Sequence, residues 1–198
     1  MEIYLIRHTT PAVATGICYG QTDLDVTNTF TTEANIIKNI VPNTVHQIYS
    51  SPLQRCTKLA THVFPHKQIE LHHHLKEINC GQWEMQAWND IAKEEITPWM
   101  ENFVHVRMPQ GENYIDVYNR VTAVFNTIVQ QRQHAAIVAH GGVLRSILSY
   151  ITNTPLIDSF KAFTLHYGCV VKINWVNNVP IHTILSNIPH AKETHKPT

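Results

Sequence analysis

The chain lacks net charge of either sign. Its 198 residues carry 15 Lys and Arg against 15 Asp and Glu. A neutral balance gives no bulk attraction to nucleic acid or to an anionic membrane surface, so we expect neither as a partner. Histidine is abundant by contrast, and the 14 histidines would make the chain cationic as the pH falls through about 6.5.

The cysteines lack C-x-x-C spacing, since Cys18, Cys56, Cys80 and Cys169 lie far apart. This argues against a zinc or thioredoxin-like site and favours reduced thiols. No basic region precedes the first apolar run, so we expect no signal peptide. No apolar run approaches the roughly 20 residues that span a bilayer. We therefore expect a cytoplasmic protein.

Internal repeats and domain linkers are also lacking, so we expect one domain over residues 1–188, followed by a polar, disordered tail over 189–198. Strand-like apolar runs alternate with segments of helical period. This alternation predicts an α/β fold: a three-layer α/β/α sandwich on a mostly parallel central sheet. The predicted strands are about 2–6, 46–50, 68–71, 135–139, 169–175 and 182–185, and the predicted helices about 27–40, 51–64, 113–128 and 142–150.

Two segments between these elements have no strong period. Segment 88–104 is rich in Trp and Phe and weakly helical, and we expect its helix to break near Pro98 and the segment to cover a pocket. The consecutive residues His72, His73 and His74 look like metal ligands. Neighbouring side chains, however, do not face one way on a strand or a helix. A solvated segment is therefore preferred over a metal site.

Two of the predicted strands end in histidine. The first apolar run ends in Arg7 and His8 before a Thr-Thr-Pro turn, and the run 135–139 ends in His140 before two glycines. Ligands of α/β proteins bind outside the carboxyl ends of the parallel strands. The two histidines are therefore predicted to share one pocket.

The residue types at these positions suit phosphate chemistry. Arg7, Arg55 and His140 would give one anion three potential cations, and the arginine fork donates two hydrogen bonds to two phosphate oxygens. A neutral imidazole such as that of His8 is a competent nucleophile toward phosphorus. Phosphoryl transfer mainly needs positioning and charge stabilisation, which these groups could supply without a metal.

A leaving alkoxide also needs a proton, and the candidate acids are Glu77 and Glu84. Each residue taken alone has an ordinary alternative. Arg55 could form a salt bridge on a helix surface, and Glu77 could be a loop carboxylate without function. The combination of these residues is what requires an explanation.

Four runs of sequence carry that combination: Arg7-His8-Thr9; Ser50-Ser51-Pro52-Leu53-Gln54-Arg55-Cys56; Leu75-Lys76-Glu77 with Gly81-Gln82-Trp83-Glu84; and His140-Gly141-Gly142-Val143-Leu144-Arg145. In this order they resemble the motifs of the histidine phosphatase superfamily, which includes cofactor-dependent phosphoglycerate mutases and many small phosphatases. The likeness covers roughly residues 1 to 150. It implies a phosphoglycerate mutase-like fold and a phosphatase that needs no metal or other cofactor.

The resemblance also implies roles for individual residues. His8 would become phosphohistidine. Glu77 would protonate the leaving group and then activate water, whereas Glu84 would be structural. The groups implied to bind the transferred phosphoryl group are Arg7, Arg55, His140 and the backbone amide of Gly141.

The chain departs from the family pattern at three positions. Thr9 stands where the family usually has glycine, Ala14 where many members have asparagine, and Met85 where a Trp-Glu-Gly motif has glycine. Without that asparagine, phosphate binding on this loop would fall to Thr15 or Gln21.

The run Gly16-x-Cys18-Tyr19-Gly20-Gln21-x-Asp23 is similar to the α-ribazole phosphatase branch. This similarity implies a small-molecule phosphomonoester substrate, α-ribazole 5′-phosphate, in assembly of the cobalamin lower ligand. Tyr19 is a candidate for substrate binding, and it could stack on a base, as could Trp88 and Trp99, although core packing explains large aromatics equally well. The alternatives are a broad-specificity phosphatase, a phosphoglycerate mutase, or a catalytically silent binding module.

Overall fold

The two central strands are buried on both faces because they carry apolar side chains at nearly every position. In the computed structural model, which describes residues 1–189, β1 (Glu2–Arg7) lies parallel to β4 (Ala135–Ala139). Alternate side chains of a strand point to opposite faces. Leu5 therefore joins one core cluster and its neighbour Ile6 joins the other. Both predicted strands are confirmed.

The sheet has six strands in the order β3-β2-β4-β1-β5-β6. The pairs on the β3 side of β1 are all parallel, whereas β5 runs antiparallel to both of its neighbours. Only β5 therefore runs against the others, and the predicted, mostly parallel sheet is confirmed. The remaining strands are β2 (Gln47–Ser50), β3 (Ile69–Leu71), β5 (Val170–Val176) and β6 (Val179–Ser186).

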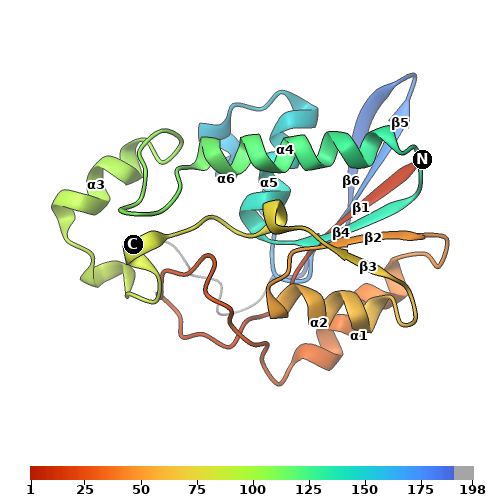
Figure 1. Cartoon of the computed structure of the whole chain (residues 1–198), viewed down its shortest axis with the longest axis horizontal. Helices are drawn as coiled ribbons and strands as arrows, with labels where there is room; N and C mark the ends of the chain where they lie inside the picture. Colours follow the sequence, from red (N-terminus) through yellow and green to blue (C-terminus); the bar gives the residue numbers. More distant parts are fainter. Residues whose placement is uncertain (190–198) are drawn as a thin grey trace.

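Helices cover both faces of the sheet, as the predicted three-layer sandwich requires. Figure 1 shows α4 and α5 on one side of the strands and α1 and α2 on the other. A short helix that was not predicted, α6 (Ser159–Ala162), packs against α5. The longer helices are α1 (Phe30–Ile40), α2 (Gln54–Val63), α4 (Tyr114–Gln130) and α5 (Gly141–Thr152).

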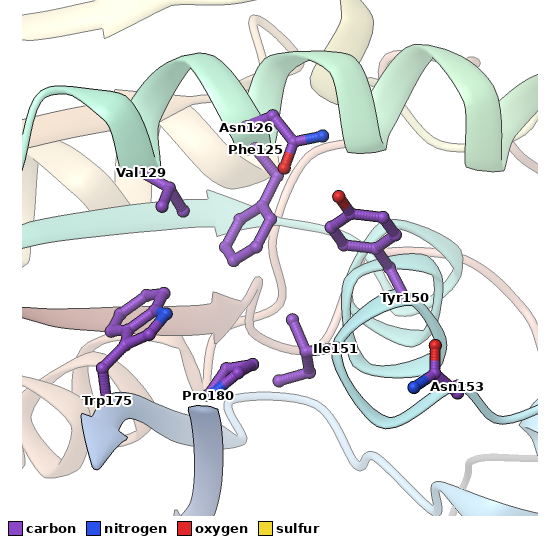
Figure 2. Close-up of a pocket in the computed structure, with 8 residues that line it drawn as sticks. All are labelled: Phe125, Asn126, Val129, Tyr150, Ile151, Asn153, Trp175 and Pro180. Atoms are coloured by element: carbon purple, nitrogen blue, oxygen red, sulfur yellow. The ribbon is translucent and has the colours of Figure 1, made fainter. Parts of the chain in front are cut away.

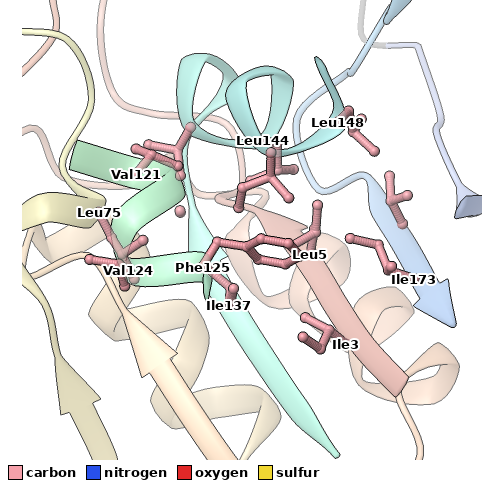
Figure 3. Packing of buried hydrophobic residues seen from close by; sticks show 14 of the residues in the cluster. Ile3, Leu5, Leu75, Val121, Val124, Phe125, Ile137, Leu144, Leu148 and Ile173 are labelled. Carbon is pink, nitrogen blue, oxygen red and sulfur yellow. The ribbon is translucent and has the colours of Figure 1, made fainter. Parts of the chain in front are cut away.

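The larger core cluster lies between the sheet and the helices α4 and α5. Figure 3 shows side chains from strands and helices meeting there, among them Leu5, Phe125, Ile137, Leu144 and Ile173. All five are buried. This packing fixes the helices against the strands, and therefore fixes the loops at the strand ends.

The longest helix, α4, begins with a side-chain cap. The Asn113 side chain accepts a hydrogen bond from the Asp116 amide at 3.1 Å, and the Asp116 side chain accepts one from the Asn113 amide at 3.3 Å. This reciprocal arrangement is a capping box. It fixes where α4 begins, directly after the turn that ends at Glu112.

The predicted break near Pro98 is wrong. Helix α3 (Lys93–Glu101) continues through Pro98. A proline inside a helix costs about 3 kcal/mol because it removes a hydrogen bond and crowds the preceding turn. Here Ile96 and Trp99, on either side of the proline, both pack into a third apolar cluster that also contains Trp83. We attribute the intact helix to that packing.

Within residues 1–189, the histidine triplet is not part of any group of three His, Cys, Asp or Glu side chains placed to hold a metal ion. Residues His73–Leu75 make one 3-10 turn, and both His73 and His74 are exposed. Other 3-10 turns lie at Gly81–Trp83, Trp88–Asp90 and Leu156–Asp158. Across residues 1–189, no helix is long and apolar enough to cross a membrane. The tail predicted over 189–198 lies outside the described residues, apart from position 189.

Candidate active site

The two strand-end histidines lie side by side. Arg7, the last residue of β1, pairs with Ala139, the last residue of β4, so His8 and His140 leave the sheet together. Their ring centroids are 5.1 Å apart in an edge-to-face arrangement. The exposed fractions are 2% for His8 and 0% for His140. The two histidines predicted to share one pocket therefore do lie together at the carboxyl ends of these strands.

The backbone fixes the tautomer of His8. Its Nδ1 lies 2.7 Å from the carbonyl oxygen of Thr9. A carbonyl oxygen only accepts hydrogen bonds, so Nδ1 carries the proton and the lone pair is on Nε2. His8 is thus held with Nδ1 toward the backbone, and Nε2 is its candidate nucleophilic atom.

His140 has a different environment. Its Nε2 lies 2.8 Å from the hydroxyl of Ser51, and the Cys56 thiol sulfur is 3.5 Å away from the same nitrogen. Burial, followed by the charges of Arg55 and nearby groups, lowers the pKa of His140 well below 6.5. His140 is therefore a neutral imidazole at neutral pH.

Arg55 comes from the first turn of α2 and is fully buried. Its Nη1 and Nη2 donate to the carbonyl oxygens of Thr22 and Gly20, at 2.8 and 2.6 Å. Within residues 1–189, its Nε is buried without a hydrogen-bond partner. Carbonyl groups do not neutralise the guanidinium, so its positive charge remains to be balanced by a ligand.

Arg7 donates to the carbonyl of Leu165, and its Cζ lies 4.1 Å from the ring centroid of Tyr167. The same tyrosine ring is 5.5 Å from the His8 ring, and its hydroxyl is 2.7 Å from that of Tyr19. Sequence reasoning missed Tyr167 because it lies outside the motifs. It reaches the site because β5 is antiparallel, so that the residues preceding this strand lie at the site.

A third arginine, Arg145, was quoted in a motif but given no role. A Cβ atom on Gly141 would lie 3.0 Å from Nη1 of Arg145 and 3.4 Å from Nε of Arg7, so the two arginines flank this glycine. Arg145 donates from Nε to the Phe163 carbonyl at 3.1 Å and stacks on the Phe160 ring at 4.4 Å. Burial and the nearby Arg7 lower the pKa of Arg145. The spacing of four residues from Gly141 on a helix could have indicated this placement.

Glu77 meets the second glycine after His140. Its Oε2 accepts the Gly142 amide and its Oε1 accepts the Ile78 amide, both at 3.0 Å. A Cβ atom on Gly142 would lie 2.3 Å from Oε1, so only glycine leaves room for this carboxyl group. Of the two candidate acids, Glu77 is therefore the one beside the histidine loop.

Glu84 holds a loop. Its carboxylate accepts the amides of Gly20, Gln21 and Thr22 at 3.0, 2.8 and 3.2 Å. Burial raises the pKa of Glu84, but hydrogen bonds from the Thr22 hydroxyl and from the amides of Gly20, Gln21 and Cys80 outweigh burial, and the pKa is lowered. An ionised Glu84 thus shapes the loop whose carbonyls bind Arg55, in agreement with the structural role implied for it.

The remaining predicted residues differ in whether they contact the histidines or Glu77. Tyr19 reaches the histidines through Tyr167, with its own pKa raised by burial. The Gln21 side chain donates to the Glu77 carbonyl at 3.1 Å. Thr15 is exposed and makes no hydrogen bond within residues 1–189, so its predicted contact with phosphate stays a prediction. Trp88 stacks on another tryptophan in the third cluster and is 8% exposed.

The charges around the histidines form a candidate anion site. Arg7, Arg55 and Arg145 converge on the loop after His140, and Glu77 is the carboxylate beside them. Within residues 1–189, no group of three His, Cys, Asp or Glu side chains is placed to hold a metal ion. The excess of positive charge suits a phosphoryl dianion.

A separate hollow of about 350 Å³ lies at the opposite ends of the strands (Figure 2). Its walls come from the last turns of α4 and α5 and from the β5–β6 hairpin. None of these residues is charged, so the hollow offers no phosphate chemistry. They are Phe125, Asn126, Val129, Tyr150, Ile151, Asn153, Trp175 and Pro180.

Comparison with known proteins identifies the family and the fold of the chain. The family model for the histidine phosphatase superfamily (branch 1) matches residues 3–186, and the chain therefore belongs to that superfamily. The crystal structure of the alpha-ribazole phosphatase from Shigella flexneri has the same fold. It aligns with a TM-score of 0.85 at 20% identity and covers 100% of this chain and 99% of that chain. The predicted phosphoglycerate mutase-like fold is confirmed.

Two curated relatives differ in how much of them the chain spans. The adenosylcobalamin/alpha-ribazole phosphatase of Escherichia coli (strain K12) is 24% identical over 178 residues, which cover 85% of this chain and 87% of that protein. A 6-phosphofructo-2-kinase/fructose-2,6-bisphosphatase of Arabidopsis thaliana is 31% identical over 114 residues. That match covers 55% of this chain but only 15% of the Arabidopsis protein.

Proposed function

We propose that the protein is a metal-independent phosphomonoester hydrolase that works through a phosphohistidine on His8. The observation that carries this proposal is the fixed tautomer of His8. Its Nδ1 proton is held by the Thr9 carbonyl, which leaves the Nε2 lone pair among Arg7, Arg55 and His140. A nucleophile pre-oriented beside two arginine cations and the neutral ring of His140, which the sequence had suggested as a third cation, meets the two needs of phosphoryl transfer.

In the first step, Nε2 of His8 attacks phosphorus and the bond to the leaving-group oxygen breaks. The carboxyl proton of Glu77 passes to that oxygen, so an alcohol leaves. The Nδ1–H remains hydrogen-bonded to Thr9, which stabilises the positive charge on the phosphorylated ring. Arg7, Arg55 and the Gly141 amide bind the phosphoryl oxygens.

In the second step, the Glu77 carboxylate takes a proton from water, whose oxygen attacks phosphorus. The Nε2–P bond breaks, inorganic phosphate leaves, and His8 and Glu77 return to their starting forms. Neutral His140 donates a hydrogen bond to the phosphoryl group. Because its ring is neutral, it adds no positive charge that would repel the arginines.

For the substrate, we infer α-ribazole 5′-phosphate. The inference is supported by the loop around Tyr19, which is similar to the α-ribazole phosphatase branch, and by the names of the Escherichia coli relative and the Shigella flexneri structure. A phosphate monoester with one aromatic base also suits a pocket in which Tyr19 and Tyr167 adjoin His8.

The test is steady-state hydrolysis of a panel of phosphomonoesters in the presence of a chelator. The panel contains α-ribazole 5′-phosphate, 3-phosphoglycerate, a nucleoside monophosphate and a sugar phosphate. We expect kcat/KM for α-ribazole 5′-phosphate to exceed the others by about a hundredfold, or about 2.7 kcal/mol of transition-state discrimination. A flat profile would indicate a broad-specificity phosphatase instead.

The His8→Ala variant tests the mechanism. We expect it to lose hydrolysis of every ester and to form no phosphoenzyme, because the bond-forming nitrogen is gone. Residual activity close to that of the unmodified protein would rule out a phosphohistidine on His8. Loss of activity with chelator alone would instead show a metal requirement.

A further inference from the structure

We propose that Arg120, on α4, is a positioning residue that holds the Glu77 acid at the histidine loop, an inference that rests on the proposed function. Glu77 lies in a segment, 76–80, that belongs to no helix or strand. No regular backbone ladder therefore fixes its place. A proton donor must nevertheless stay within hydrogen-bond reach of the leaving oxygen.

Arg120 donates hydrogen bonds to the backbone around Glu77. Its Nη1 donates to the carbonyls of His74 and Lys76 at 2.6 and 2.7 Å, and its Nη2 donates to the carbonyl of Glu77 at 2.9 Å. The Nε–Nη2 edge of the guanidinium forms a paired contact with the Glu112 carboxylate, at 2.8 Å from Nε and 3.0 Å from Nη2. One side chain thus grips three carbonyls in four residues.

Glu112 forms hydrogen bonds with segment 76–80 on the other side of Glu77, at Asn79. Its Oε2 accepts the Asn79 amide, and its own amide donates to the Asn79 carbonyl, both at 2.8 Å. A Cβ atom on Gly111 would lie 2.3 Å from that carbonyl oxygen, so the glycine lets the turn lie flat against the segment. The Glu77 backbone is therefore clamped before and after the acid.

The pair is well shielded and its geometry is rigid. The side chains of Arg120 and Glu112 are 13% and 19% exposed. Two parallel hydrogen bonds between a guanidinium and a carboxylate fix direction as well as distance. Because the carbonyl of Glu77 is bound directly, movement of this pair would move the carboxyl group that meets Gly142.

The test compares two leaving groups. An alkyl phosphate such as α-ribazole 5′-phosphate needs an acid to protonate its alkoxide, whereas p-nitrophenyl phosphate releases a stable phenolate without one. We expect Arg120→Met to lower kcat/KM for the alkyl ester about a hundredfold and for the aryl ester less than about threefold. Glu77→Gln should show the same selectivity.

Arg107 provides the matched control. It is another arginine paired with a carboxylate beside the same turn, donating to the Gly111 carbonyl at 3.1 Å and to Asp116 at 2.5 Å, and within residues 1–189 no hydrogen bond or ion pair joins it to segment 76–80. Arg107→Met should leave the ratio of the two kcat/KM values unchanged. If Arg120→Met does not fold, Arg120→Lys, which keeps the charge but not the fork, should still show about a tenfold selective loss.

The outcomes separate this inference from the proposed function. Equal losses with both esters in the Arg120 variants would mean a purely structural role and would overturn the inference, while selective loss in Glu77→Gln left the proposed function intact. Failure of the unmodified protein to hydrolyse either ester would overturn the proposed function and the inference together.

Discussion

At the scale of single residues, His8 and His140 show how position alone separates two chemically identical side chains. Both follow parallel strands at the same edge of the sheet. His8 donates Nδ1 to a backbone carbonyl, whereas His140 faces the Ser51 hydroxyl and the Cys56 thiol. One ring is therefore held with Nε2 as the proposed nucleophile, and the other is a buried neutral group whose protonation the fold opposes.

The lowered pKa of buried His140 predicts that the stability of the protein depends on pH. The folded protein does not take up a proton on His140 where the unfolded chain does, below about pH 6.5, so protonation favours the unfolded state. The free energy of unfolding should fall as the pH falls below that value, by about 1.4 kcal/mol per pH unit from this residue. Urea unfolding between about pH 7 and 5 measures the slope.

His140→Asn should lose this part of the slope, whereas the same change at His73, an exposed histidine of the 72–74 triplet, should keep it. Equal slopes in the unmodified protein and in His140→Asn would show that His140 is protonated in the folded state.

Sequence could identify site residues only where a motif or a strand end marked them. His8, Arg7 and His140 stand at predicted strand ends, so their meeting followed from topology. Tyr167 and Phe160 carry no such mark, since their approach to the site depends on the direction of β5 and on a helix of four residues. Arg120 is an ordinary helix residue until its carbonyl partners are seen.

At the scale of elements, local chemistry explains where α4 begins. Besides the capping box, the Asn113 side chain donates to the His105 carbonyl at 3.0 Å. We expect Asn113→Ala to lower the free energy of unfolding by about 1 kcal/mol, because an amide of the first turn loses its partner. Urea unfolding measures the difference. Asn119→Ala, an exposed position in the same helix, should be neutral or slightly stabilising; an equal loss there would assign the effect to helix content rather than to the cap.

Element boundaries show where such local rules were incomplete. Strand β6 begins at Val179, before the predicted residue 182, because Asn177 and Asn178 both adopt positive φ and close a two-residue hairpin. Helix α3 passes Pro98 because tertiary packing outweighs the local penalty. The first error came from leaving out the turn formed by two adjacent asparagines. The second came from weighing Pro98 without the side chains that pack around it.

At the scale of the whole molecule, the anion site draws on β1, α2, β4 and α5, so a bound anion should stabilise the entire fold. We expect inorganic phosphate at about one hundred times its Kd to add about 2.7 kcal/mol to the free energy of unfolding. Unfolding in phosphate against sodium chloride of equal ionic strength measures this linkage. Arg55→Met should remove most of the phosphate effect. An equal rise in both salts, or an undiminished rise in Arg55→Met, would argue against a specific site.

The fold as a whole was predictable because its central strands are apolar on both faces and its helices keep a regular period. These two sequence patterns, the continuous apolar strands and the periodic helices, specify a covered parallel sheet whatever the loops contain. The antiparallel direction of β5 is not encoded in such periods, since a buried strand reads alike in both directions.

The place of β1 in the middle of the sheet has a consequence for how the protein is made. Ile3 pairs with Ala135 on one side and with Ile173 on the other. During translation, β1 therefore leaves the ribosome long before either neighbour exists, and its apolar residues must wait without a partner. The proposed nucleophile, His8, is synthesised early but assembled late, so a nascent chain stalled before β4 would hold this histidine and still lack the rest of its site.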